Sequence, residues 1–406
     1  MSHASYPHRK SHSMTRRERF ERALRCEEVD RLPFWAKVFG DSYLAFQDEK
    51  YRAMGELELA DYLDLDHMAG GGVAVACTNP RVERHVEQTN GLRVVRETTP
   101  DGTLTTVERS DPATRAWHPV EFPIKTRADL RAARHIFAGN RFEAAPDALA
   151  RSAERLAAVA DRGIVITSMG ISPLMNLIQH LIGPDATYFF LSDFPDEMDE
   201  LIALMHAERL RYLRAMLPAC AYDYICSVEN TSTTLLSPAV FERYCWPHLA
   251  DYGRLIREHG KHHVLHMCGH LKALLPRIGA LPAIAIEAFT SPPVGNTTLA
   301  DRARLCPRTS VIGGTSAVLW LQPANVICET IERDLAEAGT MRGVVLTSAG
   351  VMPPACPLEK VRQVREFVKG ITEAGLSRAA AAGARAPERA VGQSETRGCC
   401  APGRRC

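Results

Sequence analysis

Short apolar segments alternate with longer helical patterns from about residue 127 to about residue 374, and this alternation leaves few folds open to the chain. Apolar runs predict strands at 164–167, 224–228, 262–268, 283–288, 310–312 and 343–347. Between and after them, helices are predicted at 172–182, 195–216, 237–249, 271–279, 323–338 and 357–374. Repeated βα units indicate a parallel sheet, and their number favours a closed (β/α)8 TIM barrel, an α/β fold, over an open sheet.

Two segments precede these units. An apolar helical face begins at Thr15, and it predicts a helical lead-in to the barrel. Residues 81–123 instead show alternating polar and apolar positions, with turn dipeptides at Asn90-Gly91 and Asp101-Gly102. This pattern predicts a β-hairpin insertion laid over the barrel.

The chain is therefore expected to have three parts. Residues 1–13 are interpreted as a flexible leader, and residues 14–376 as the barrel with its insertion. The segment 377–406 contains almost no large apolar side chain, so it is predicted to be a disordered tail that carries the cysteines 399, 400 and 406.

Composition excludes several classes of function. The net charge of +1 gives no electrostatic footprint for nucleic acid or an acidic membrane, and no apolar run is long enough to span a bilayer. The N-terminus lacks the apolar region of a secretory signal, so a cytoplasmic location is expected. The 12 cysteines follow no regular framework, which favours free thiols and a metal site over disulfides.

The predicted strand 262–268 ends in the sequence His266-Met267-Cys268-Gly269. Side chains two residues apart in a strand point to the same face, so His266 and Cys268 are expected to project together. Imidazole and thiolate are ligands that zinc prefers, and the glycine lets the backbone turn away. A core histidine beside a structural thiol is the alternative.

Polar residues at two other strand ends are further candidates. Glu229 and Asn230 end the strand 224–228, where the carboxylate could be a zinc ligand, a partner of His266 or an orienting group for substrate, or could cap a neighbouring loop. Weaker candidates of the same kind are Asp64, Asp66, His67 and Asp223.

Met169 and Gly170 follow the strand 164–167. They indicate close approach of the backbone to a ligand, and we predict that they contact the cofactor. A simple turn requirement for the glycine is the alternative.

The stretch MTRRERFERALRCEEVDRLPFW resembles the opening of the uroporphyrinogen decarboxylase superfamily, in which a helix of the form ERxxxALxGxxxDRxP precedes the first barrel strand. The His-x-Cys-Gly sequence resembles its cobamide-dependent methyltransferase branch, which is similar to methylcobalamin:coenzyme M methyltransferases. That resemblance implies a zinc ion bound by His266, Cys268 and a later cysteine. The position expected for the later cysteine holds Val351, so Cys356, five residues on, is predicted as the third ligand.

The resemblance implies an enzyme, a zinc-dependent methyltransferase that moves a methyl group between a corrinoid (cobalamin) and a thiol or related acceptor. The partners implied are a corrinoid protein and a small thiol or methyl donor, and a homodimer is also considered. A first alternative is a decarboxylase acting on a smaller substrate, because the segment after the first strand has Lys37 and no arginine to hold a polyacid porphyrin. A second alternative is a metal- or metalloid-binding protein that uses the terminal thiols.

Overall fold

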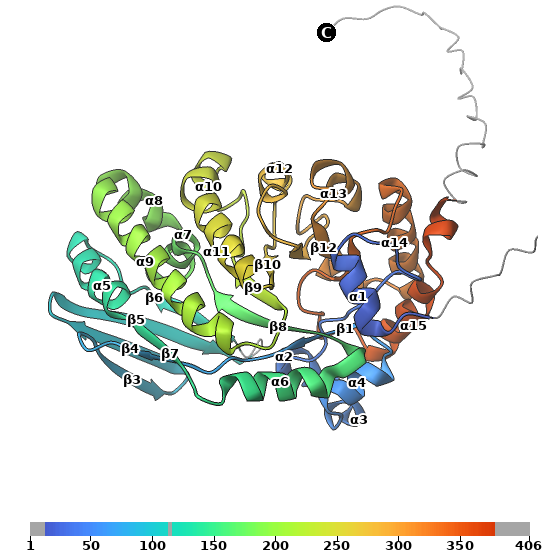
Figure 1. Ribbon diagram of the computed structural model, residues 1–406, viewed down its shortest axis with the longest axis horizontal. Helices are drawn as coiled ribbons and strands as arrows, with labels where there is room; N and C mark the ends of the chain where they lie inside the picture. The colour runs from blue at the N-terminus through green and yellow to red at the C-terminus, as the bar shows by residue number, and fades with distance from the viewer. Residues whose placement is uncertain (1–12, 113–115, 378–406) are drawn as a thin grey trace, which may run out of the picture.

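The chain forms an α/β fold around a curled parallel sheet (Figure 1). The computed structural model describes residues 13–112 and 116–377. The strand order of the seven-stranded sheet is β1-β8-β9-β10-β11-β12-β13. Its strands are β1 (His67–Gly70), β8 (Gly163–Gly170), β9 (Tyr224–Val228), β10 (His262–His266), β11 (Ala285–Phe289), β12 (Ser310–Thr315) and β13 (Val344–Ser348).

A short extended segment lies between the first and last strands of this sheet. Phe34 forms a parallel β-bridge with Leu346 of β13, and the backbone N–H of Trp35 donates to the Leu346 carbonyl at 3.0 Å. On the other side, the N–H of Asp66, just before β1, donates to the Phe34 carbonyl at 2.9 Å. The expected α/β class and parallel sheet are therefore confirmed, with seven full strands and one short segment that bonds to both edges.

Helices surround the sheet. The proline at the start of α9 and the Ser237 side chain that accepts the N–H of Val240 at 3.3 Å fix where two of them begin. The α-helices of the described residues are α1 (Arg16–Leu24), α2 (Asp41–Leu44), α3 (Glu49–Arg52), α4 (Glu56–Tyr62), α5 (Arg127–Gly139), α6 (Ala148–Val159), α7 (Pro173–Asn176), α8 (Pro184–Asp193), α9 (Pro195–Met216), α10 (Pro238–Tyr244), α11 (Trp246–Glu258), α12 (Leu275–Ile278), α13 (Leu299–Leu305), α14 (Ala324–Ala338) and α15 (Leu358–Lys369). Shorter turns are η1 (Ala160–Arg162), η2 (Leu177–Leu181), η3 (Leu217–Ala219) and η4 (Ala317–Leu321).

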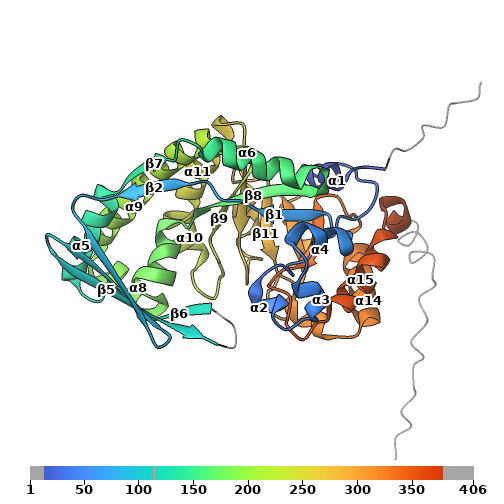
Figure 2. The same cartoon turned by 90° about the horizontal axis from the view of Figure 1, so that it is seen from below.

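A second, antiparallel sheet extends from one end of the molecule (Figure 2). The turn between its first two strands has Asn90 and Gly91 at φ 47° and 74°, which suits the twist of a hairpin. Leu104 of this sheet joins a core cluster with Leu130 of α5 and Leu201 of α9. The four strands are β3 (Glu83–Thr89), β4 (Leu92–Thr99), β5 (Gly102–Asp111) and β6 (Ala116–Glu121), and a separate pair is β2 (Val75–Thr78) with β7 (Arg141–Ala144).

Within the described ranges, no helix is long and apolar enough to cross a membrane. The predicted leader and tail, including the cysteines 399, 400 and 406, lie outside the described residues except for Ser13 and Ser377.

Candidate functional site

The candidate site lies at the C-terminal end of β10. His266 is the last residue of this strand, and Cys268 follows two residues later, close enough for a hydrogen bond between the two side chains. The Cys268 thiol also lies 3.4 Å from the amide oxygen of Asn230, at the end of the neighbouring β9. The imidazole and the thiol are therefore side by side at the end of the strands where barrel enzymes carry their chemistry.

Glu287, on the adjacent strand β11, fixes the ring of His266. The two residues are direct partners in the register of the strands, and the Glu287 carboxylate is hydrogen-bonded to Nδ1 of His266. Because Nδ1 is occupied, Nε2 is the ring nitrogen left for a metal or a substrate. A carboxylate on the second nitrogen is the arrangement that usually supports a histidine ligand.

Lys37 completes a row of three charged groups. Its ammonium forms an ion pair with the second oxygen of Glu287 and donates to the carbonyl of Ala349 at 3.0 Å. Burial raises the pKa of Glu287, but Lys37 and His266 outweigh this effect, so that the pKa lies below its usual value. Glu287 is therefore a buried carboxylate that stays charged, held between a lysine and a histidine.

His266 is mostly buried, with 24% of its side chain exposed. Burial alone would lower its pKa, but hydrogen bonds with Cys268 and Glu287 raise the pKa to about 9. The imidazole therefore carries a proton at neutral pH when no metal is bound. Because a metal ligand must be deprotonated, binding a metal here would release that proton.

The backbone of Glu229 and Asn230 supports this arrangement. Their N–H groups donate to the carbonyl of His266 at 2.9 and 3.1 Å. The Glu229 side chain points elsewhere: it accepts hydrogen bonds from the hydroxyl and, at 3.2 Å, the N–H of Ser172. Burial raises the pKa of Glu229 to about 7 against the opposing bonds from Ser172 and Ser227. Of the pair, Asn230 has its side chain at Cys268, whereas Glu229 acts through the backbone.

The backbone at Met169 and Gly170 lies against a neighbouring arginine. The Arg209 guanidinium donates to the carbonyl of Met169 at 2.6 Å. Gly170 has φ 91°, and a Cβ there would lie 2.6 Å from the same guanidinium. The close approach expected at this glycine therefore exists, but its partner is Arg209 of α9, and contact of these two residues with a cofactor stays a prediction.

The structure does not bring Cys356 to this pair. Its side chain is fully buried, and its thiol lies 3.9 Å from the carbonyl of Pro357. Across residues 13–112 and 116–377, no group of three or more His, Cys, Asp or Glu side chains is placed to hold a metal ion. Of the three predicted ligands, the structure therefore brings His266 and Cys268 together and does not group Cys356 with them.

The weaker sequence candidates have structural roles. Asp66 pairs with Arg19 and Arg31 and accepts the N–H of Phe34 at 3.0 Å. Its neighbour His67, at the start of β1, is hydrogen-bonded to Glu56. In the same way, Asp64 pairs with Arg16, Arg365 and Lys369, and Asp223 pairs with Arg17. These residues stabilise the opposite end of the barrel.

Solvent reaches the inner side of the strands next to the pair. Alternate residues of β8 and β9 are partly or fully exposed although their neighbours are buried: Ile166, Ser168, Cys226 and Val228. Alternation with a period of two means that these residues share the face that β10 presents through His266. The face of the sheet that carries His266 is therefore incompletely buried on β8 and β9.

Glu287 and its pairing with Lys37 were not predicted from the sequence. A signal was present, because Glu287 is a single carboxylate within the apolar run Ala-Ile-Glu-Ala-Phe. A charge inside a buried strand is rarely tolerated without a partner.

Comparison with known proteins agrees with this architecture. A search of curated proteins found no match. A methyltransferase from Methanosarcina mazei has a similar structure, with a TM-score of 0.54 and 14% sequence identity, over 87% of this chain and 98% of that chain. At this identity, the likeness shows the fold. The uroporphyrinogen decarboxylase (URO-D) family model matches residues 120–371, which is more than half of the chain. The chain therefore belongs to the uroporphyrinogen decarboxylase family.

Proposed function

We propose that this protein is a methyltransferase that moves a methyl group between a corrinoid and a thiol or related acceptor, with a zinc ion held by His266 and Cys268. The observation that carries the proposal is the adjacent imidazole and thiol at the end of β10, with Glu287 on the second ring nitrogen. The likeness to the fold of a methyltransferase is in keeping with it.

Each residue around the pair has a separate task. Glu287 holds Nδ1 of His266 and leaves Nε2 free, and Lys37 balances the charge of the carboxylate. Cys268 would bind the ion through its sulfur, and its contact with the Asn230 amide oxygen limits where that sulfur can lie. A zinc ion in such a site would lower the pKa of the acceptor thiol. His266 and Cys268 are the two residues that would hold the ion, and the acceptor thiol would bind beside them.

A corrinoid carried on a separate protein needs a surface on which to dock, and exposed apolar side chains gather at one side of the barrel mouth. They come from the loops that follow β11, β12 and β13 and from the end of α2, and they are Val294, Val318, Leu321, Val351 and Phe46. We call these five residues the apolar rim. Apolar side chains exposed together commonly mark an interaction site.

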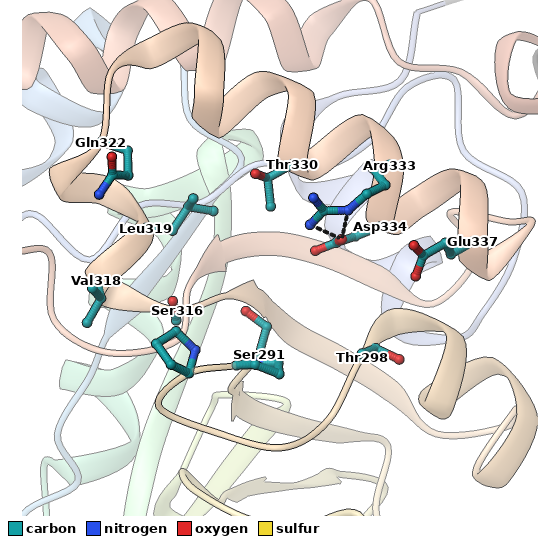
Figure 3. Close-up of a pocket in the computed structure, with 12 residues that line it drawn as sticks. Ser291, Thr298, Ser316, Val318, Leu319, Gln322, Thr330, Arg333, Asp334 and Glu337 are labelled. Carbon is teal, nitrogen blue, oxygen red and sulfur yellow. Dashed lines mark hydrogen bonds and ion pairs between the residues drawn. The ribbon is translucent and has the colours of Figure 1, made fainter. Parts of the chain in front are cut away.

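The loops that carry the apolar rim lie next to one another. Figure 3 shows Ser291, after β11, and Ser316 and Val318, after β12, around one pocket of about 400 Å³. A Cβ on Gly350, after β13, would lie 3.3 Å from the Cβ of Ala317. The Gln47 amide donates to the carbonyl of Pro354 at 3.0 Å, which joins the end of α2 to the same loop. The segments that carry the apolar rim are therefore neighbours, and we propose the rim as the docking surface for the corrinoid protein.

Metal analysis tests the central proposal. Purified protein is expected to bind about one zinc ion per chain, and His266→Ala and Cys268→Ala are each expected to lose it. In Glu287→Gln, the ring loses its charged partner, so zinc affinity measured by competition with a chelator is expected to fall roughly 10- to 100-fold. Zinc content that is the same in both alanine variants as in the wild type would remove the proposal.

Two cysteine variants complete this experiment. Cys356→Ser decides whether the predicted third ligand takes part, and the geometry leads us to expect unchanged zinc content. Cys328→Ser, on α14, is the matched control for the loss of one thiol. Zinc lost from Cys356→Ser but retained in Cys328→Ser would restore Cys356 as a ligand.

The decarboxylase alternative requires a cationic pocket without a metal. Lys37 is the candidate cation, but its ammonium already forms an ion pair with the Glu287 carboxylate, so its charge is neutralised within the protein. The alternative of a metal- or metalloid-binding protein rests on the thiols of the cysteines 399, 400 and 406. Methyl transfer that survives deletion of residues 396–406 would eliminate it.

A further inference from the structure

A second cavity, of about 430 Å³, lies at the opposite end of the strands from His266. Its lining includes Ala283, two residues before β11, and Thr309, next to the start of β12. His266, in contrast, is the last residue of β10. Because the strands are parallel, their first residues face one end of the barrel and their last residues face the other. The cavity is therefore a separate site.

Three arginines line this cavity, and none of the residues lining it is acidic. Arg254 and Arg257 stand three residues apart on α11 and so share one face of the helix, and Arg308 comes from the loop before β12. Arg254 forms an ion pair with Asp251, which does not line the cavity. In the described part of the chain, the side chains of Arg257 and Arg308 have neither an ion pair nor a hydrogen bond.

The walls that carry these arginines are closely packed. A Cβ on Gly253 of α11 would lie 2.7 Å from Pro282, in the loop that forms the floor. A Cβ on Gly279, in the same loop, would lie 2.7 Å from the Cβ of Cys306. Trp246 closes one side, and its ring N–H is used by a backbone carbonyl at 2.9 Å. The backbones of α11 and of this loop are therefore closely packed, while the charged ends of Arg257 and Arg308 have no partner among the described residues.

We propose that this cavity binds a small molecule that carries a diphosphate group. A guanidinium binds phosphate oxygens through two parallel N–H donors, and such charge-assisted bonds are stronger than neutral ones. Arg257 and Arg308 approach from two different walls, which suits two linked phosphates better than one. The volume is in the range of ligand sites and exceeds what a single inorganic phosphate needs.

Calorimetric titration of the full chain at low ionic strength tests the proposal, with inorganic pyrophosphate and ADP as probes. Both are expected to bind saturably, with one molecule per chain. Loss of one charged donor should weaken binding roughly 10- to 100-fold in Arg257→Ala and in Arg308→Ala. ADP binding more tightly than pyrophosphate would show that the rest of the nucleotide also contributes, and equal affinities would show recognition of the diphosphate alone.

Arg52→Ala is the matched control, because Arg52 of α3 is also exposed and has no ion pair among the described residues. Its affinity for pyrophosphate should equal that of the wild type. His266→Ala should also bind pyrophosphate normally, so this experiment is independent of the proposed zinc site. All the substituted arginines are exposed, and thermal unfolding would verify that the variants are folded. The proposal fails if neither probe binds saturably at millimolar concentration, or if both cavity variants bind as the wild type does.

Discussion

Two buried histidines, His263 and His248, have pKa values well below the usual value for histidine. His263, three residues before His266, is fully buried, and its Nε2 is hydrogen-bonded to the Ser227 hydroxyl at 2.9 Å. Burial lowers its pKa to about 3. His248 behaves similarly, since burial beside His206 lowers its pKa to about 4. Both imidazoles are therefore neutral in the folded protein at any pH at which it is expected to be stable.

The pKa of His263 leads to a prediction on acid unfolding. The folded pKa lies below the unfolded value of about 6.5, so only the unfolded state takes up this proton as the pH falls from 6.5 towards 3. The free energy of unfolding should therefore fall below pH 6.5, with His263 contributing up to about 1.4 kcal/mol per pH unit. In His263→Gln, urea unfolding at pH 7, 6 and 5 should show a shallower slope.

The control for this measurement is His259→Gln, because His259 lies exposed at the end of α11. Its slope should match that of the wild type. The same slope in His263→Gln and the wild type would show that His263 does not determine the acid sensitivity.

At the scale of the element, β10 is bounded by two glycines with positive φ. Gly260 precedes the strand at φ 70°, and a Cβ there would meet nothing within 4 Å. Gly269 follows Cys268 at φ 114°, and a Cβ there would lie 2.9 Å from the Ser232 side chain. The hydroxyl of Ser232 in turn accepts the N–H of His270 at 3.1 Å. The turn after the candidate site therefore requires a glycine, both for its positive φ and for the close approach of Ser232.

These two glycines provide a matched comparison. Gly260→Ala should cost about 1 kcal/mol of unfolding free energy, because only backbone strain is added. Gly269→Ala should cost roughly 2–4 kcal/mol, because strain and a steric clash are combined. It should also lower zinc affinity by displacing Cys268. Urea unfolding and chelator competition measure both effects, and equal costs for the two substitutions would contradict the argument.

Element boundaries were predicted with mixed success, for identifiable reasons. The helix predicted at 195–216 is confirmed as α9, whose long pattern and initial proline leave little ambiguity. The helix predicted at 271–279 is only α12, Leu275–Ile278, because residues 272–274 form turns instead. The segment after Pro33, where the resemblance places the first barrel strand, forms only the single bridge of Phe34 with Leu346.

At the scale of the whole molecule, the apolar rim should affect encounter with a protein partner but leave chemistry unchanged. Leu321→Glu and Val351→Asp place a charge at positions that are 49% and 57% exposed, so folding should be little affected. The KM for a protein-bound methylcorrinoid is expected to rise at least about 10-fold, because charge opposes burial of this surface. With free methylcobalamin, kcat should not change.

Val86→Asp is the control for the rim, because Val86 is an exposed valine on β3 of the antiparallel sheet. It should leave both kinetic values as in the wild type. An unchanged KM for the protein-bound donor in both rim variants would exclude this surface as the docking site.

The α/β class, the parallel order of repeated βα units and the end of a strand at His266-x-Cys268 could be predicted from the amino-acid sequence, because these depend on periodicity along the chain. Which residues meet depends on how the elements pack. Glu287 and Lys37 are 250 residues apart in the sequence. They become partners because the parallel sheet curls and sets the segment after Trp35 and the strand β11 around one interior. Cys356 is separated from His266 for the same reason: position in the sequence indicates which loop carries a side chain, and packing decides where it points.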